Sequence, residues 1–224
     1  MKKISFAVTA ILIATAMFAQ TSDKFTTAMQ SKLALMDSAK DANALKDVAA
    51  AFERIGDAEK TQWLPYYYAA LSQVNAGNQT MNALGSLNNF ANNADKLDPY
   101  ADKAEELLNK AEALSKDNSE IFVVKKMIAT LRLMGDPMNR YMTYGPEGTT
   151  ALEKAKKLNP DNPRPYVLEG MDKFYTPEQY GGSKEEAKKL FEEALKKYAA
   201  FKPETNISPT WGRTLVEGLM AQMK

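Results

Sequence analysis

The sequence predicts an all-α protein, because helical spacing of apolar residues, helix-capping pairs and internal self-similarity all indicate helices. Apolar residues recur every three or four positions along most of the chain, which places each set on one face of a helix. Three such sets are Leu45, Val48, Ala49, Phe52 and Ile55; Ala104, Leu107, Leu108, Ala111 and Leu114; and Ala187, Leu190, Phe191, Ala194, Leu195 and Tyr198. No segment of comparable length alternates apolar and polar residues, so the sequence predicts no β-strand.

Prolines and capping residues indicate where the predicted helices begin. Three pairs place a capping side chain before a proline at the first helical position, and Ser183 with Glu186 has the spacing of a capping box. The pairs are Asp98-Pro99, Asp136-Pro137 and Asn162-Pro163. About ten helices result, at residues 24–38, 41–56, 63–76, 79–96, 99–116, 119–134, 148–158, 163–175, 183–200 and 208–222. A short helical turn is also expected after Pro137.

The first residues have the layout of a secretory signal peptide. Lys2 and Lys3 precede an apolar run from Ile4 to Phe18, and Ala19 supplies a small residue for cleavage. The run is shorter than the about 20 residues that a membrane span needs, although an N-terminal anchor helix is the alternative. We therefore expect residues 1–19 to be removed and 20–224 to form one helical repeat domain. Without any cysteine for lipid attachment, that domain would be periplasmic or secreted, with no membrane insertion.

The chain also contains an internal repeat. Residues 114–122 align with residues 158–166, with leucine, aspartate, asparagine and an aromatic residue in register. Upstream, Leu108 and Ala111 match Leu152 and Ala155, and a weaker third copy begins at Phe201. Repeats of this length are typical of stacked helix pairs, in which each pair buries a face against the next.

At these positions the chain resembles the tetratricopeptide repeat (TPR), and specifically short secreted bacterial TPR proteins. Leu152, Ala155 and Pro160 match the later part of the second-helix pattern, while Phe191 and Ala194 match the earlier part. The period of 44 residues differs from the about 34 residues of that family, and only fragments of its first-helix signature are present. The resemblance implies a right-handed α-solenoid of degenerate helix pairs whose concave surface binds peptides or proteins. It implies no defined activity.

Composition excludes most catalytic chemistry. The chain has no histidine and no cysteine, which removes the commonest general base, thiol catalysis and ordinary zinc sites. Gly181-Gly182 precedes a helix, but no predicted strand leads into it, so a phosphate-binding loop is not indicated. Because its net charge is only +1, the chain has no strong positive potential that would attract nucleic acid. We expect a protein that is not an enzyme and has no cofactor and no metal site.

Two features suggest a binding surface. Residues 61–94 contain no charged residue, and Asn89 and Asn93 share one face of the predicted helix 79–96 with further polar residues. This face would hydrogen-bond a polar partner; alternatively, the helix is packed on two sides or its amides are simply solvated. The second feature is the connection from Gly135 to Gly148, which carries Arg140, Tyr141, Met142 and Tyr144.

Later connections add further aromatic residues, Tyr175, Tyr180 and Trp211. Aromatic side chains and arginine on loops commonly form recognition hot spots. The candidate partner-binding residues are Arg140, Tyr144, Tyr180, Trp211, Asn89 and Asn93. The alternative is that the loop residues fill gaps between non-ideal repeats.

Two functions follow from these observations. The first is a non-catalytic protein- or peptide-interaction module of the cell envelope. The second is a small-molecule-binding accessory protein of a periplasmic transport system, since Tyr180-Gly181-Gly182 before a helix is loosely similar to TPR solenoids that enclose a ligand channel. An open groove in the structure would favour the first function, and an enclosed apolar pocket the second.

Overall fold

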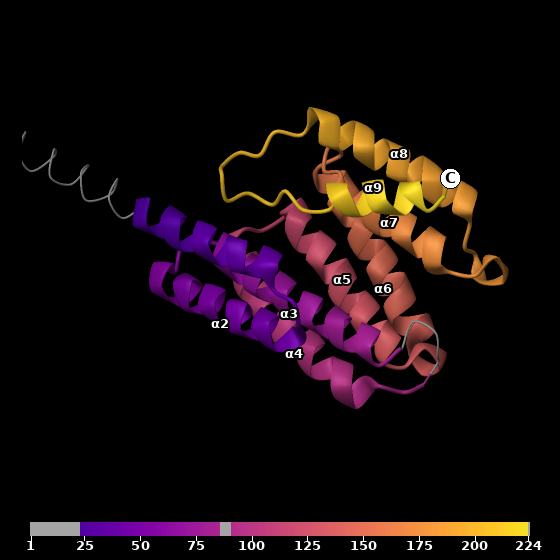
Figure 1. The fold of residues 1–224 in the computed structure, drawn as a ribbon, viewed down its shortest axis with the longest axis horizontal. Helices are drawn as coiled ribbons and strands as arrows, with labels where there is room; N and C mark the ends of the chain where they lie inside the picture. Colours follow the sequence, from indigo (N-terminus) through magenta and orange to yellow (C-terminus); the bar gives the residue numbers. More distant parts are fainter. Residues whose placement is uncertain (1–22, 86–90, 224) are drawn as a thin grey trace, which may run out of the picture.

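The computed structural model describes residues 23–85 and 91–223, and within these residues it is all-helical, as predicted (Figure 1). Residues 23–38 form the first described helix, and residues 1–19, the predicted signal peptide, lie outside the described part. The elements that follow are α2 (Ala42–Glu59), α3 (Leu64–Ala83), α4 (Ala94–Leu114), α5 (Ser119–Gly135), α6 (Pro137–Leu158), α7 (Arg164–Tyr175), the 3-10 turn η1 (Glu178–Tyr180), α8 (Lys184–Ala200) and α9 (Arg213–Ala221).

The predicted helix over residues 79–96 is wrong. Helix α3 continues to Ala83, and Gly85 adopts a left-handed conformation with φ of 67°. The next helix begins at Ala94, so Pro99 lies inside α4 rather than at its first position. Asp98 is therefore not a cap. Within the charge-free segment, α3 is largely buried, because it is a central helix that packs on α2, α4 and α5.

The helical turn expected after Pro137 is present, but the rest of the predicted connection from Gly135 to Gly148 is wrong. Helix α6 begins with Pro137 and continues through Gly145 and Pro146 to Leu158. Arg140, Tyr141, Met142 and Tyr144 are thus helical residues, not loop residues. The last predicted helix, 208–222, is shorter in the structure, and a connection with turns over residues 201–212 joins α8 to α9.

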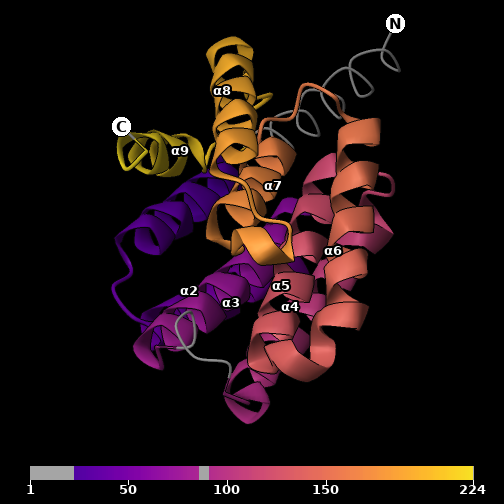
Figure 2. The same cartoon turned by 90° about the vertical axis from the view of Figure 1, so that its right-hand side faces the viewer.

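Helices that are adjacent in the sequence pack against one another. In addition, α3 contacts α5, and α5 contacts α7. Figure 2 shows α7 between the α5–α6 pair and the α8–α9 pair. The largest apolar core lies among α2 to α5 and includes Phe52, Tyr67 and Leu131. A second core joins α7, α8 and α9 around Phe191. The right-handed solenoid and the relation to the TPR family remain predictions.

The internal repeat has a direct structural counterpart. Asn118 precedes α5, and its side-chain oxygen accepts a hydrogen bond from the backbone N–H of Glu120 at 2.9 Å. Asn162 precedes α7, and its side-chain oxygen accepts from the N–H of Arg164 at 3.0 Å. The two repeat copies therefore begin their helices in the same way, and the equivalent residues Glu120 and Arg164 face each other across the α5–α7 contact.

Candidate functional site

Five large apolar side chains are exposed on α6, at the end of α7 and in η1. Their exposed fractions are Met138 73%, Tyr141 58%, Met142 79%, Tyr175 56% and Tyr180 64%. Both segments that carry them, the first half of α6 and the α7–α8 connection, lie at the same end of the molecule (Figures 1 and 2). We call these five residues the aromatic end. Other exposed leucines, such as Leu35 and Leu215, are scattered singly, which is normal for a protein surface.

The first part of the aromatic end is one face of α6. Met138, Tyr141 and Met142 have helical spacing, and Gly145 continues their face one turn later. A Cβ atom at Gly145 would touch only the Tyr141 ring, at 3.9 Å, so the glycine leaves this face flat and open. A helix of two full turns thus presents two thioethers and a phenol to the surroundings.

Arg140 fixes this half of α6 to α4. Its guanidinium donates hydrogen bonds of 2.6 and 2.8 Å to the two carboxylate oxygens of Asp98, and a third bond reaches the carbonyl of Arg132. The hydrogen bond from Arg140 lowers the pKa of Asp98 below its ordinary value. Bidentate pairs of this kind are geometrically specific. Arg140 therefore holds the exposed face of α6 in place.

The second part of the aromatic end is the corner between α7 and α8. Tyr175 is the last residue of α7, and the chain turns through η1 to Gly181, whose φ is 93°. Gly182 is required here, because a Cβ atom would lie 1.7 Å from the carbonyl oxygen of Thr176. Ser183 then caps α8, and its hydroxyl accepts a hydrogen bond from the N–H of Glu186, which is one half of the predicted capping box. The other half is not formed, because the N–H of Ser183 donates to the carbonyl of Lys173 and the Glu186 carboxylate pairs with Lys173.

A shallow depression of about 250 Å³ lies in this corner. Its lining residues are Lys173, Phe174, Tyr175, Thr176, Pro177, Glu178, Ser183 and Lys184. The ammonium group of Lys184 lies 3.2 Å from the centre of the Phe174 ring, and that of Lys173 forms a 2.6 Å ion pair with Glu186. The depression thus combines aromatic walls with two cationic groups.

Of the predicted binding residues, Tyr180 belongs to the aromatic end, and Arg140 and Tyr144 lie on α6 beside it. Tyr144 is half-buried, and the Arg140 guanidinium carbon lies 5.9 Å from its ring centre. Asn93 is buried at the start of α4, where its backbone N–H donates to Gly135 at 2.7 Å. Asn89 lies outside the described residues. Whether any of these residues contacts a partner stays a prediction.

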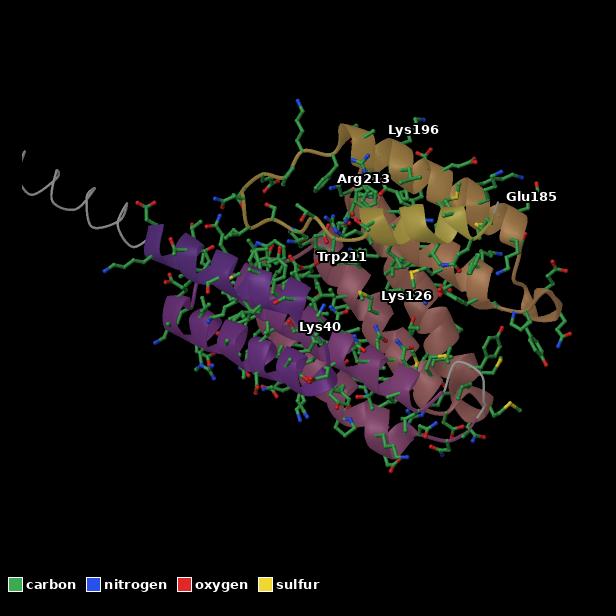
Figure 3. The ribbon with its side chains drawn as sticks, in the orientation of Figure 1. Lys40, Lys126, Glu185, Lys196, Trp211 and Arg213 are labelled. Carbon is green, nitrogen blue, oxygen red and sulfur yellow. The ribbon has the colours of Figure 1, made fainter. Side chains whose placement is uncertain are left out.

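Trp211 lies away from this end, in a buried polar cluster under the 201–212 segment (Figure 3). Its indole N–H donates to the hydroxyl of Tyr67 at 2.9 Å, and Tyr67 donates to Glu120 at 3.1 Å. Glu120 pairs with the fully buried Arg164 at 2.8 Å. Burial raises the pKa of Glu120, against the lowering influence of Arg164. Trp211 therefore has the contacts of a gap-filling residue.

Sequence reasoning missed three members of the depression, Lys173, Phe174 and Lys184, and the exposed Met138. Lysines and a phenylalanine on amphipathic helices carry no special pattern, and only the fold brings the end of α7 against the start of α8. No group of His, Cys, Asp and Glu suited to a metal ion occurs among the described residues, and none of the described helices is long and apolar enough to cross a membrane.

No protein-family model matches the chain, and a search of curated proteins gives no match. Among solved structures, the fold is similar to that of the HusA haemophore from Porphyromonas gingivalis, with a TM-score of 0.74 and 32% sequence identity. The similarity covers 89% of this chain and 92% of that chain. The shared sequence and fold therefore extend over nearly the whole of both proteins, and the chain belongs to the family of the HusA haemophore.

Proposed function

We propose that this protein is a secreted, non-catalytic haem-binding protein that holds a tetrapyrrole against the aromatic end. The observation that carries the proposal is the similarity to a haemophore over nearly the full length of both chains. It favours the small-molecule function predicted from the sequence over the protein-interaction module, although the depression between α7 and α8 is open and not the enclosed apolar pocket expected for that function. It also supports binding rather than catalysis.

The chemistry of the aromatic end fits a tetrapyrrole. A porphyrin is a broad, flat π-system, and the faces of Tyr141, Tyr175 and Tyr180 can stack on it in offset or edge-to-face geometry. The thioethers of Met138 and Met142 are polarisable and also make favourable contacts with aromatic rings. All five side chains are already exposed, so binding would remove apolar surface from water without unfolding any helix.

Iron ligation is limited by composition. Because the chain has no histidine and no cysteine, tyrosine and methionine are its residue types known to hold haem iron. The depression of about 250 Å³ is smaller than the about 300–1,000 Å³ of pockets that enclose drug-sized ligands. We therefore propose that the ring lies on the surface and is held mainly by contacts with its faces. The iron-free ring should accordingly bind within about tenfold of haem, a difference of about 1.4 kcal/mol.

Titration of the purified protein with haemin, followed by the Soret absorbance, tests the proposal. The wild-type protein should give a saturable change. Replacing Tyr175 and Tyr180 by alanine together should weaken binding at least about thirtyfold, which corresponds to a loss of about 2 kcal/mol. The same loss is expected for Tyr141→Ala combined with Met142→Ala.

The matched control is Leu215→Ala, which removes an exposed apolar side chain on α9 outside the aromatic end. It should leave haemin affinity unchanged. A wild-type protein that gives no saturable change would refute haem binding. Normal affinity in both double variants would instead refute this location for the site.

A further inference from the structure

We propose that Lys184 and Lys173 recognise carboxylate groups at the edge of the ligand, so that the protein selects an aromatic ring bearing acidic side groups over a neutral one. This inference rests on the proposed function and adds to it the charge of the ligand. It follows from the contacts that the two ammonium groups make at the rim of the α7–α8 depression.

The position of the Lys184 ammonium is fixed, but only some of its hydrogen-bond donors are occupied. It donates a 2.8 Å hydrogen bond to the carbonyl of Phe174 and lies over the face of the Phe174 ring. A lysine ammonium has three donors, so further donors are open to a ligand. The neighbouring carboxylates serve other lysines: Glu185 pairs with Lys189 at 2.6 Å, and Glu186 pairs with Lys173. Lys184 therefore brings a positive charge to the depression without either of these counter-ions.

The Lys173 ammonium approaches the same depression from α7. Besides its ion pair with Glu186, it donates a 3.3 Å hydrogen bond to the carbonyl of Gly181. The carbonyl of Lys173 accepts a 2.9 Å bond from the N–H of Ser183, which fixes the end of α7 against the start of α8. Two cations from different helices thus line one depression, next to the exposed Tyr175.

This arrangement suits a ligand with an apolar aromatic body and acidic groups at one edge. The body would lie on the tyrosine rings, while carboxylate oxygens would accept hydrogen bonds from the lysines. A hydrogen bond between charged groups is worth more than one between neutral groups. Glu178 lines the same depression and is exposed, so its carboxylate would repel an acidic ligand. Removing the charge of Lys184 should therefore weaken binding of an acidic ligand, and removing the charge of Glu178 should strengthen it.

The test compares iron-free protoporphyrin IX, which carries two carboxylates, with its dimethyl ester, which has the same ring and no charge. Binding is followed by quenching of tryptophan fluorescence. The free acid should bind wild-type protein at least about tenfold more tightly than the ester, since tenfold corresponds to about 1.4 kcal/mol. Lys184→Met should remove most of this preference by weakening the acid alone, and Lys184→Arg should keep it. Glu178→Gln should tighten the acid and leave the ester unchanged.

Lys196→Met is the matched control. Lys196 is on the same helix but near its opposite end from Glu185, with a side chain 81% exposed (Figure 3). This variant should keep the wild-type ratio of the two affinities. Equal binding of acid and ester by wild-type protein overturns the carboxylate proposal while leaving tetrapyrrole binding intact, and it requires no variant to fold. A preference that survives both Lys184→Met and Lys173→Met also overturns it. If neither porphyrin binds, the proposed function itself fails.

Discussion

At the scale of single residues, the buried pair of Arg164 and Glu120 is the least ordinary feature of the protein. Arg164 is completely buried, and its guanidinium lies 5.1 Å from the centre of the Phe201 ring and 5.5 Å from that of Trp211. It also donates to the carbonyl of Pro209. The pair thus links α5 and α7 to the connection over residues 201–212. Breaking a buried pair is costly because it leaves one charge without a partner.

We expect Arg164→Met to lower the free energy of unfolding by about 3–5 kcal/mol, the usual range when one member of a buried pair is removed. Glu120 would then keep only its hydrogen bonds from Tyr67 and Asn162. The double variant Glu120→Gln, Arg164→Met should be more stable than Arg164→Met alone, because no unpaired charge remains. Urea denaturation measures both values. A double variant less stable than the single one would contradict this account of the pair.

At the scale of elements, α6 explains where sequence reasoning succeeds and where it fails. The second half, from Ala151 to Leu158, was predictable because its apolar residues repeat with helical spacing and match the earlier repeat copy. For the first half, the sequence predicted only a helical turn after Pro137, because Gly145, Pro146 and Gly148 are poor helix formers. Tertiary contacts outweigh that local preference: α6 packs along α5, and Arg140 holds its first turns to Asp98.

Two glycines on α6 should respond oppositely to alanine. At Gly145 the new methyl group meets only the Tyr141 ring at an ordinary distance, so Gly145→Ala should stabilise the protein by about 0.4–1 kcal/mol through the unfolded chain. At Gly148 it would lie 2.8 Å from the Cδ atom of the buried Lys126, whose ammonium pairs with Asp172 at 2.9 Å. Gly148→Ala should therefore destabilise it. Thermal unfolding of the two variants checks the signs, and a fall in melting temperature for Gly145→Ala would contradict the first.

At the scale of the whole molecule, the sequence was sufficient for the all-helical class but not for the binding surface. Helical periodicity is a local property, and most helices follow it. The aromatic end, in contrast, requires that the first half of α6 be helical and that two segments separated in the sequence lie at the same end of the fold. The aromatic residues predicted together as one binding group lie in two different places. Tyr180 is exposed at the aromatic end, whereas Trp211 is hydrogen-bonded to Tyr67 and Tyr198 in the buried cluster.

The central claim is that a tetrapyrrole binds at the aromatic end, and an amide NMR titration with iron-free protoporphyrin IX tests it most directly. Each backbone N–H then reports on its own surroundings, and the iron-free ring avoids paramagnetic broadening. At saturation, we expect the largest shifts in residues 137–145 and 173–186, with residues 42–59 of α2 nearly unchanged. Shifts concentrated instead in residues 63–68 and 205–212, or no shifts at saturating ligand, would contradict the account.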